Sequence, residues 1–181
     1  MLNEQEVLKI VAKRLASAGV PYMITGSVAM NFYATPRMTR DIDIVIRTQE
    51  DDIEKLYKLF ANDFYVDIDS IKEALYRRRM FNVIHMEGIV KVDFIIRKET
   101  EYRQVEFQRR RRVVFEGVEM DIVAPEDLII SKLDWAKESL SEIQMKDVAN
   151  IIRMVPDLET GYIQKWALKL GLEDIYRKVK R

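Results

Sequence analysis

Two aspartates, Asp41 and Asp43, open a run of apolar, β-branched residues that continues to Ile46. Side chains alternate across a β-strand, so both carboxylates lie on one face and the isoleucines lie on the other. Neighbouring carboxylates repel each other, and this repulsion is tolerated mainly where a cation neutralises them. The segment therefore predicts a strand with one buried face and one cation-binding face, and such oxygen pairs suit Mg²⁺.

Composition excludes several other classes of site. The chain of 181 residues is 48% hydrophobic, enough for one core and a small helical appendage. It contains no cysteine, which excludes disulfides, thiolate catalysis and zinc–cysteine sites. Its 30 basic and 30 acidic residues cancel, so any affinity for nucleic acid must come from local patches.

The hydropathy pattern contains no membrane segment. No apolar run approaches the roughly 20 residues that are needed to cross a bilayer. The amino terminus is polar and acidic, unlike a signal peptide. We therefore expect a cytoplasmic protein without a membrane partner.

Periodicity and turn residues change in character at Ala124-Pro125. Helices are expected at 4–18, 26–34, 50–60, 70–78, 125–138, 141–154 and 159–180, the last broken near Gly171, and strands at 22–25, 41–47, 64–67, 81–86, 89–96, 113–115 and 118–123. This order predicts an α/β (α+β) protein with a mixed, twisted sheet, helices on one face and the cation site on the other. Residues 1–124 are expected to form the α/β core, and residues 125–181 a helical region packed on it.

Two hairpins are predicted to turn on the same dipeptide, Glu87-Gly88 and Glu116-Gly117. Glycine in the second turn position can adopt the positive φ that a tight hairpin requires. A two-residue turn at Glu87-Gly88 pairs Asp93 with Asn82 and puts His85, the single histidine, on the opposite face. Asp93 is then a third acid within an apolar strand, where a charge is costly unless it is paired or metal-bound.

Gly26 and Ser27 lie where a predicted strand passes into a helix. Glycine lets a phosphate approach the backbone, and a helix N-terminus offers free N–H donors and the positive end of the helix dipole. Taken alone, Ser27 could be an ordinary helix cap. Together with the downstream aspartates, the pair predicts a site for a triphosphate.

A Gly-Ser pair, a helix, Asp-x-Asp on the next strand and a later single Asp together resemble the DNA polymerase β type nucleotidyltransferases. The segment Arg37–Asp43 resembles more specifically the AbiEii-type (abortive-infection) enzymes of bacteria and archaea, with their Arg-x-Thr/Ser-x-Asp-hydrophobic-Asp signature. The segment Ala124–Leu133, with Pro-Glu-Asp-Leu followed by a lysine, is similar to the same group. Lys146–Asn150 departs from the group's Arg-Asp-x-x-Asp pattern at its last position. The resemblance covers residues 20–150.

The resemblance implies a polymerase β-like fold and a nucleotidyltransferase that moves an NMP from an NTP to an unknown hydroxyl acceptor. It implies two Mg²⁺ or Mn²⁺ ions held by the catalytic residues Asp41, Asp43 and Asp93. Phosphate binding would fall to Gly26, Ser27, Arg37, Thr39 and Lys132. The acceptor is open between RNA, protein and a small molecule, and a protein partner is possible. The alternative is a catalytically degenerate nucleotide- or partner-binding module of a toxin–antitoxin system.

Other conspicuous residues have simple structural interpretations. The basic runs Arg77–Arg79 and Arg109–Arg112 are expected to pair with acids or face solvent, the alternative being an RNA or polyphosphate site. Trp135 and Trp166 are expected to pack between helices and not to stack on bases. Asp147 is expected to be an ordinary helix acid, with a site role as the alternative.

Overall fold

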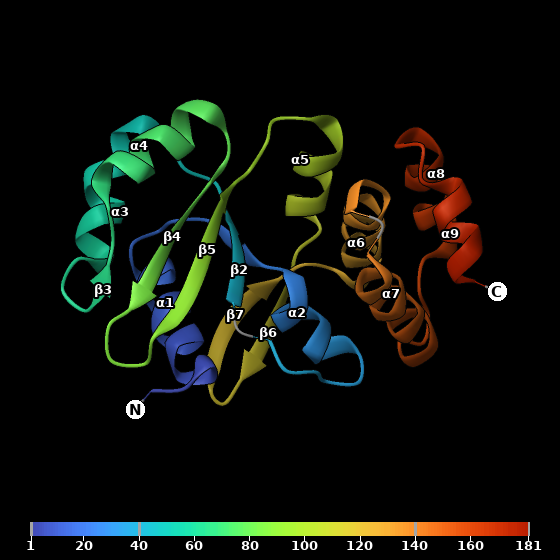
Figure 1. Cartoon of the computed structure of the whole chain (residues 1–181), viewed down its shortest axis with the longest axis horizontal. Coiled ribbons are helices and arrows are strands. Elements are labelled where there is room, and N and C mark those ends of the chain that lie inside the picture. Colours follow the sequence, from blue (N-terminus) through green and yellow to red (C-terminus); the bar gives the residue numbers. More distant parts are fainter. Residues whose placement is uncertain (1, 40, 140, 181) are drawn as a thin grey trace.

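A mixed sheet of seven strands in the order β3-β4-β5-β2-β1-β7-β6 organises the described part of the protein (Figure 1). The computed structural model describes residues 2–39, 41–139 and 141–180, so Arg40 of the aspartate motif lies outside the described residues. The strands are β1 (Tyr22–Ile24), β2 (Asp41–Ile46), β3 (Phe64–Tyr65), β4 (Met80–His85), β5 (Val90–Ile96), β6 (Arg111–Phe115) and β7 (Val118–Ile122). β2 runs parallel to β5, and β1 runs parallel to β7, while the other neighbours are antiparallel. The predicted mixed α/β fold is confirmed.

The helices follow the predicted order with one addition. They are α1 (Glu4–Ser17), α2 (Gly26–Tyr33), α3 (Ile53–Phe60) after a short 3₁₀ turn at Glu50–Asp52, α4 (Ile68–Arg77), α5 (Glu101–Gln108), α6 (Pro125–Ser139), α7 (Glu142–Met154), α8 (Thr160–Lys169) and α9 (Glu173–Val179). The sequence did not predict α5, because one of its buried positions is a glutamate, Glu106, which breaks the apolar periodicity. The break near Gly171 between α8 and α9 is confirmed.

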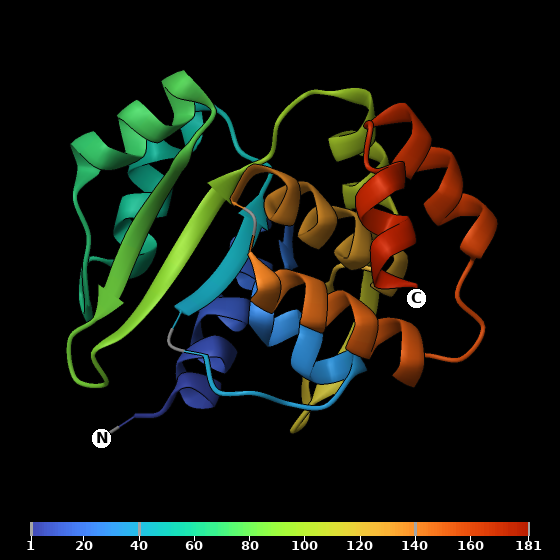
Figure 2. The same ribbon diagram turned by 45° about the vertical axis from the view of Figure 1, so that its right-hand side comes forward.

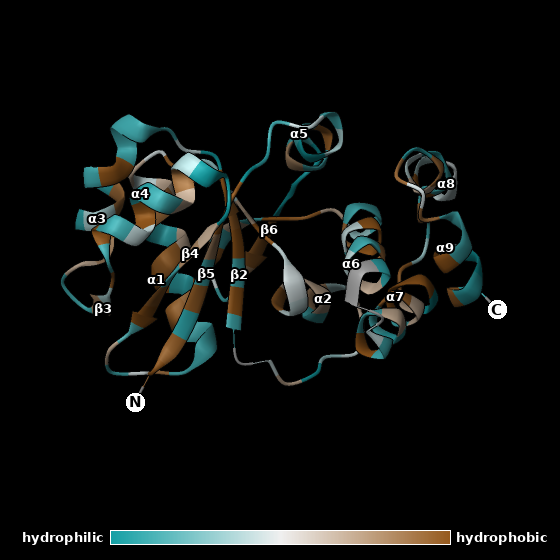
Figure 3. Ribbon diagram, turned by 45° about the horizontal axis from the view of Figure 1, so that its top comes forward, coloured by the Kyte–Doolittle hydropathy of each residue, from teal (hydrophilic) through white to brown (hydrophobic). Residues whose placement is uncertain are grey.

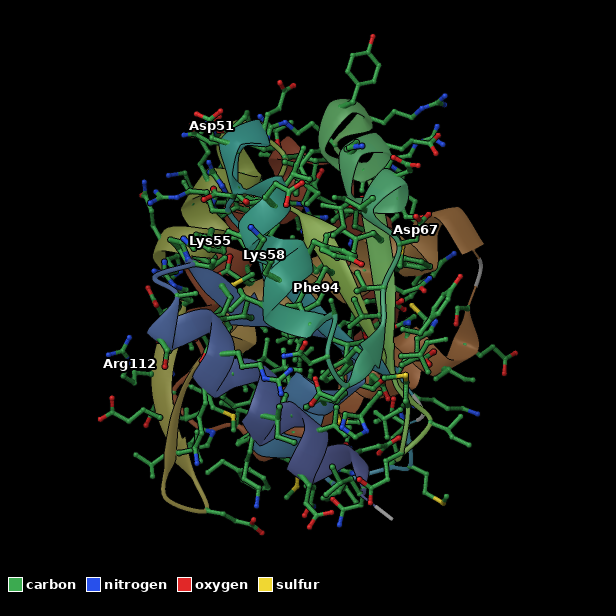
Figure 4. All side chains as sticks on the ribbon, turned by 90° about the vertical axis from the view of Figure 1, so that its left-hand side faces the viewer. Asp51, Lys55, Lys58, Asp67, Phe94 and Arg112 are labelled. Atoms are coloured by element: carbon green, nitrogen blue, oxygen red, sulfur yellow. The ribbon has the colours of Figure 1, made fainter. Side chains whose placement is uncertain are left out.

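Helices α1, α3 and α4 cover the face of the sheet that carries the isoleucines of β2 (Figure 4). Ile42, Ile44 and Ile46 are fully buried there, and the Phe60 ring of α3 lies 5.2 Å from the ring of Phe94 on β5. Burying a side chain of this size contributes about 1.5–3 kcal/mol relative to exposing it. The hydropathy colours agree, since β2 and β5 carry more hydrophobic residues than α3 and α4 outside them (Figure 3).

The opposite face of the sheet meets α2 and the carboxy-terminal helices. Helix α7 lies beside α2, and α8 and α9 lie beyond α6 and α7 (Figure 2). The face with the aspartates is therefore flanked by α2, α6 and α7. Within the described residues, every helix is too short or too polar to cross a membrane.

The two hairpins reach their registers in different ways. Asn82 pairs with Asp93 as predicted, but four residues connect β4 and β5, and the residue with positive φ is Ile89 (φ 52°). The prediction that Gly88 supplies the positive φ is wrong. A Cβ at Gly88 would instead lie 2.6 Å from the Leu2 carbonyl oxygen. The β6–β7 turn follows the prediction, with Glu116 (φ 46°) and Gly117 (φ 79°) both left-handed.

The Arg109–Arg112 run is paired with carboxylates and helps to join the sheet to the carboxy-terminal helices. Asp127 of α6 is fully buried and accepts hydrogen bonds from Arg109 Nε at 3.0 Å and the Tyr162 hydroxyl at 2.6 Å. The Arg109 guanidinium also lies 3.9 Å from the centroid of the Tyr162 ring. Arg110 and Arg112 pair with Asp121, and Arg111 pairs with Glu126. The division at residues 124 and 125 stays a prediction, and this cluster crosses it.

We predict that Asp127→Ala lowers the free energy of unfolding by about 3–5 kcal/mol, because it leaves the Arg109 guanidinium without its most buried partner. Urea denaturation followed by circular dichroism measures the effect. Glu119→Ala is the matched control, since Glu119 is an exposed acid on β7 that pairs with Arg112 on β6. It should change stability by less than about 0.5 kcal/mol. Equal stabilities of the two variants would contradict a structural role for the cluster.

Candidate active site

The parallel register of β2 and β5 brings the three predicted aspartates onto one face of the sheet. Asp43 is the direct neighbour of Asp93, and Asp41 is the direct neighbour of Lys91. Their exposure rises toward the start of the strands: the Asp93 residue is 5% exposed, Asp43 is partly buried, and the Asp41 side chain is 47% exposed. The structure therefore places three like charges side by side in a gradient of burial.

Lys91 supplies a cation to this cluster, a role that was not predicted. Its Nζ lies 2.9 Å from Asp93 Oδ2 and 3.4 Å from Asp41 Oδ2. The hydrogen bond to Asp93 raises the pKa of Lys91, outweighing the effect of its burial. Strand alternation had put Lys91 on the face of Asp93, but the reach of its side chain toward β2 depends on the parallel pairing.

One ammonium does not neutralise three carboxylates. Burial, together with the neighbouring charges of Asp93 and Asp41, raises the pKa of Asp43 to about 6. Asp93 Oδ1 is buried and has no hydrogen-bond partner among the described residues. Buried polar atoms are normally hydrogen-bonded, so this oxygen and the raised pKa of Asp43 both indicate missing positive charge.

The carboxylates do not form a closed metal cage. Among the described residues, no three histidine or acidic side chains are arranged so that they could hold a metal ion. This arrangement fits Mg²⁺, which binds through one or two carboxylates together with substrate phosphates and seldom in a dedicated protein cage. The donor set and the unpaired Asp93 oxygen are therefore compatible with a divalent ion that arrives with its substrate.

Gly26 brings the start of α2 against Asp43. Its φ is +65°, and the Thr25 N–H donates to the Asp43 carbonyl oxygen at 2.9 Å. A Cβ at Gly26 would collide with Asp43 Oδ2 and would lie 2.8 Å from Asp43 Cγ. The first N–H groups of a helix have no partner within the helix. Gly26 thus allows these donors to lie next to the Asp43 carboxylate.

A second charged network joins α2, α6 and α7 beside this corner. Arg37 donates to both carboxylate oxygens of Asp147, at 3.1 and 2.9 Å, and to Ser27 Oγ at 2.6 Å. Lys132 Nζ lies 2.7 Å from Asp147 Oδ2 and 3.0 Å from Gln144 Oε1. Asp147 is therefore no ordinary helix acid, because it positions two of the predicted phosphate-binding cations.

The protonation states in this network follow from burial and pairing. Burial lowers the pKa of Lys132, and Asp147 opposes part of that shift. Burial acting alone would raise the pKa of Asp147, but the hydrogen bonds from Arg37 and Lys132 outweigh it and lower this pKa. Lys132 is itself buried, unlike an ordinary surface lysine.

Thr39 has a different position from the other predicted phosphate ligands. Its hydroxyl donates to the Asp41 carbonyl oxygen at 3.2 Å, and it lines a separate hollow with Glu4 and Val28. Asn31 fixes the same loop through two hydrogen bonds of 3.0 Å with the backbone of Arg37. In this structure Thr39 orders the approach to β2, and its contact with phosphate stays a prediction.

A cavity of about 180 Å³ connects these groups. It is lined by Thr25, Gly26, Ser27, Asp43, Ile95, Leu128, Ser131, Lys132, Trp135 and Gln144. Trp135 is 65% exposed at this cavity, so the prediction that it packs between helices is wrong. Trp166 is buried against Tyr102 as predicted.

His85 lies away from this cluster, as the hairpin register predicted. It is buried on the face of β4 that also carries Val83, and its ring packs edge-on against Phe64. Its Nδ1 accepts a hydrogen bond from the Gly88 N–H at 3.1 Å. These contacts are structural.

Residues 4–179 match the model of the family described as "Nucleotidyl transferase of unknown function (DUF2204)". The chain belongs to this family. The match spans nearly the whole sequence and includes the aspartates, the Gly26 corner and the helices that carry Lys132 and Asp147. The protein is therefore a nucleotidyltransferase by family, and the polymerase β-like fold applies to the chain as a whole.

Solved structures share this fold at low sequence identity. An antigenic nucleotidyltransferase-like protein from Paracoccidioides brasiliensis is 20% identical with a TM-score of 0.56, covering 96% of this chain and 90% of its own. ANT(2")-Ia in complex with adenylyl-2"-tobramycin is 14% identical with a TM-score of 0.57, over 94% and 96%. The lincosamide antibiotic adenylyltransferase LnuA, lincomycin-bound, is 13% identical with a TM-score of 0.56, over 85% and 99%. A comparison with curated proteins finds no match.

We predict that Gly26→Ala destabilises this nucleotidyltransferase and displaces Asp43. The left-handed backbone alone costs alanine about 1–2 kcal/mol, and the collision with the Asp43 carboxylate adds to that. Gly161→Ala is the matched control, because a Cβ there would meet no heavy atom within 4 Å among the described residues outside the neighbouring backbone of α8. That substitution should stabilise the helix by about 0.5–1 kcal/mol. Urea denaturation measures the stability of both variants. A Gly26→Ala variant as stable as the wild type would disprove the close approach of Gly26 to Asp43.

We predict that Asp43→Asn stabilises the metal-free protein at alkaline pH. A folded-state pKa of about 6 lies above the ordinary aspartate value of about 4, so the folded state binds the proton more tightly than the unfolded state. Wild-type stability therefore falls as the pH rises between these values, and the full loss persists above about pH 6. Asparagine cannot ionise and escapes this loss.

Denaturation in EDTA at several pH values measures the difference between Asp43→Asn and wild type. The gain should be largest near about pH 8 and should shrink toward about pH 4. Asp51→Asn is the control, because Asp51 lies exposed in the turn before α3 (Figure 4). A gain for Asp43→Asn that does not vary with pH would contradict the raised pKa.

Proposed function

We propose that this protein is a Mg²⁺- or Mn²⁺-dependent enzyme that transfers an NMP from an NTP to a hydroxyl group of an acceptor. The observation that carries the proposal is the pairing of Asp43 with Asp93, under-neutralised and next to the open amino terminus of α2. A carboxylate pair and a helix N-terminus at one corner bind the two halves of a metal–triphosphate complex. Family membership supports the same reaction class.

Asp41, Asp43 and Asp93 would hold two divalent ions. When bound, such ions neutralise the triphosphate and stabilise the charge on the attacking and leaving oxygens. The gradient of exposure from Asp93 to Asp41 suits this division of work, since the buried acid is fixed in place and the exposed acid meets incoming ligand. Lys91 would give up part of its contact with Asp93 and Asp41 as that charge arrives.

The phosphates would lie against Gly26 and Ser27, with Lys132 lining the same cavity. Arg37 would act from the other side of Ser27, to which it already donates. Asp147 holds Lys132 and Arg37 in place before the substrate binds, so little reorganisation is needed. Thr39 would support this set by ordering the loop before β2.

In the transfer, the acceptor oxygen forms a bond to the α-phosphorus, the bond to pyrophosphate breaks, and the hydroxyl proton leaves. That proton would pass to a carboxylate of the cluster or to water. The reaction then needs positioning and charge neutralisation and requires no nucleophilic side chain.

The acceptor is a hydroxyl on a small molecule, an RNA or a protein. The names of LnuA and of the ANT(2")-Ia complex describe adenylyl transfer to antibiotics, which supports including small hydroxylated compounds in a search. We place the chain near the AbiEii-type enzymes on its Arg37–Asp43 motif, and we expect it to act in the cytoplasm. The alternative function, a degenerate module of a toxin–antitoxin pair, predicts nucleotide binding that ignores Mg²⁺, or none.

We predict label transfer from an NTP labelled in its α-phosphate, supplied with Mg²⁺ or Mn²⁺ and either a host extract or hydroxylated small molecules. Asp41→Asn, Asp43→Asn and Asp93→Asn should each lower the rate at least about a hundredfold, because metal-held charge supplies several kcal/mol in the transition state. Asp51→Asn should react like wild type, as an exposed acid outside the site.

Full turnover by Asp43→Asn would refute the site. Calorimetry with an NTP, with and without Mg²⁺, distinguishes the enzyme from the degenerate binding module. Metal-dependent binding that Asp43→Asn loses supports the enzyme, and metal-independent or absent binding by the wild type supports the degenerate module.

A further inference from the structure

The two tryptophans of the chain have opposite environments. Trp166 is 4% exposed, and its ring centroid lies 5.0 Å from that of Tyr102. Trp135 is 65% exposed although the indole is the largest side chain, and it faces the cavity that also contains Gly26 and Asp43. An amphipathic ring of this size is used where one surface contacts a ligand or partner. Trp135 is therefore accessible to a ligand that enters this cavity.

The position of Trp135 on α6 relates it to the proposed phosphate site. Trp135 follows Lys132 by one turn, and residues at this spacing lie on the same side of a helix. Both side chains line the same cavity, Lys132 from a buried position and Trp135 from an exposed one. A single ligand that reaches the Lys132 ammonium can therefore also contact the indole.

The size of the cavity indicates which part of a nucleotide lies where. Its volume of about 180 Å³ is below the range of roughly 300–1,000 Å³ that encloses a whole ligand. Its lining includes the Gly26 backbone, Ser27 and the buried Lys132, which are groups that bind phosphate. The rest of a nucleotide would then extend to the exposed rim, where Trp135 lies.

We propose that Trp135 is the platform on which the base of the bound NTP stacks. The inference rests on the proposed function and specifies how that site holds its donor. Every base has a π-face, so stacking on an indole tolerates different bases. Thr25, Ser131 and Gln144 add polar groups to the lining of the same cavity, where they could contact the edge of the base. The site therefore accepts more than one NTP, with modest differences in affinity between bases.

Tryptophan fluorescence tests the contact directly. Titration with Mg²⁺–ATP, excited at the red edge of the indole band, should quench the wild type and Trp166→Phe, because both retain Trp135. Trp135→Phe should show no quenching, because its remaining tryptophan is buried. Quenching that survives in Trp135→Phe would overturn the inference.

Affinities measured by calorimetry separate base stacking from general damage to the site. Trp135→Ala should weaken Mg²⁺–ATP binding about tenfold, and Trp135→Phe should restore most of it. Mg²⁺–tripolyphosphate, which has no base, should bind the wild type and Trp135→Ala equally. An equal loss for both ligands, or unchanged ATP affinity in Trp135→Ala, would overturn the stacking role.

The same measurements distinguish failure of this inference from failure of the proposed function. If Trp135→Ala binds Mg²⁺–ATP like the wild type and still transfers label, the nucleotidyltransferase assignment holds and the platform is wrong. If the wild type binds neither Mg²⁺–ATP nor Mg²⁺–tripolyphosphate, the proposed function and the inference are both wrong. Circular dichroism melts of each variant show that the comparison is made between folded proteins.

Discussion

The adjacency of Asp43 and Asp93 on parallel strands is the constraint around which the site is arranged. A parallel register fixes the two carboxylates side by side, and burial prevents water from screening their repulsion. The remaining groups reduce that cost or make use of it. The Lys91 ammonium, on the same strand as Asp93, offsets part of the negative charge. The absence of a side chain at Gly26 lets the start of α2 approach Asp43. Stability and function therefore oppose each other at this point of the sheet.

The second half of the site depends on contacts between segments far apart in sequence. Asp147 on α7 receives Arg37 from the loop before β2 and Lys132 from α6, so one carboxylate aligns two cations. Near the start of α6, the buried Asp127 likewise accepts hydrogen bonds from two side chains, Arg109 and Tyr162. Helix α6 is thus fixed at its start by a structural cluster and at its middle by the site network. This double attachment gives Lys132 a defined position.

The sequence predicted the parts of this structure that follow from local periodicity. Strand alternation put Asp41 and Asp43 on one face, and the position of the hairpin paired Asn82 with Asp93 even though the turn itself is longer than expected. The missed features depend on tertiary packing. Helix α5 buries a glutamate that only its arginine and serine partners make tolerable, and nothing in the periodicity of α6 shows that Trp135 faces a cavity. The pairing of Asp147 with Lys132 was likewise outside the reach of spacing rules, because two helices must first pack.

Lys91 affects the charge of the acidic cluster when no substrate is bound. Its ammonium already balances part of the charge of the acidic cluster, so the chain itself supplies some of the cation that the carboxylates require. Under the proposed mechanism, Asp41, Asp43 and Asp93 would receive magnesium together with each triphosphate. Scarcity of the free ion would then slow the enzyme without unfolding it, and activity would follow the cellular supply of the magnesium–nucleotide complex.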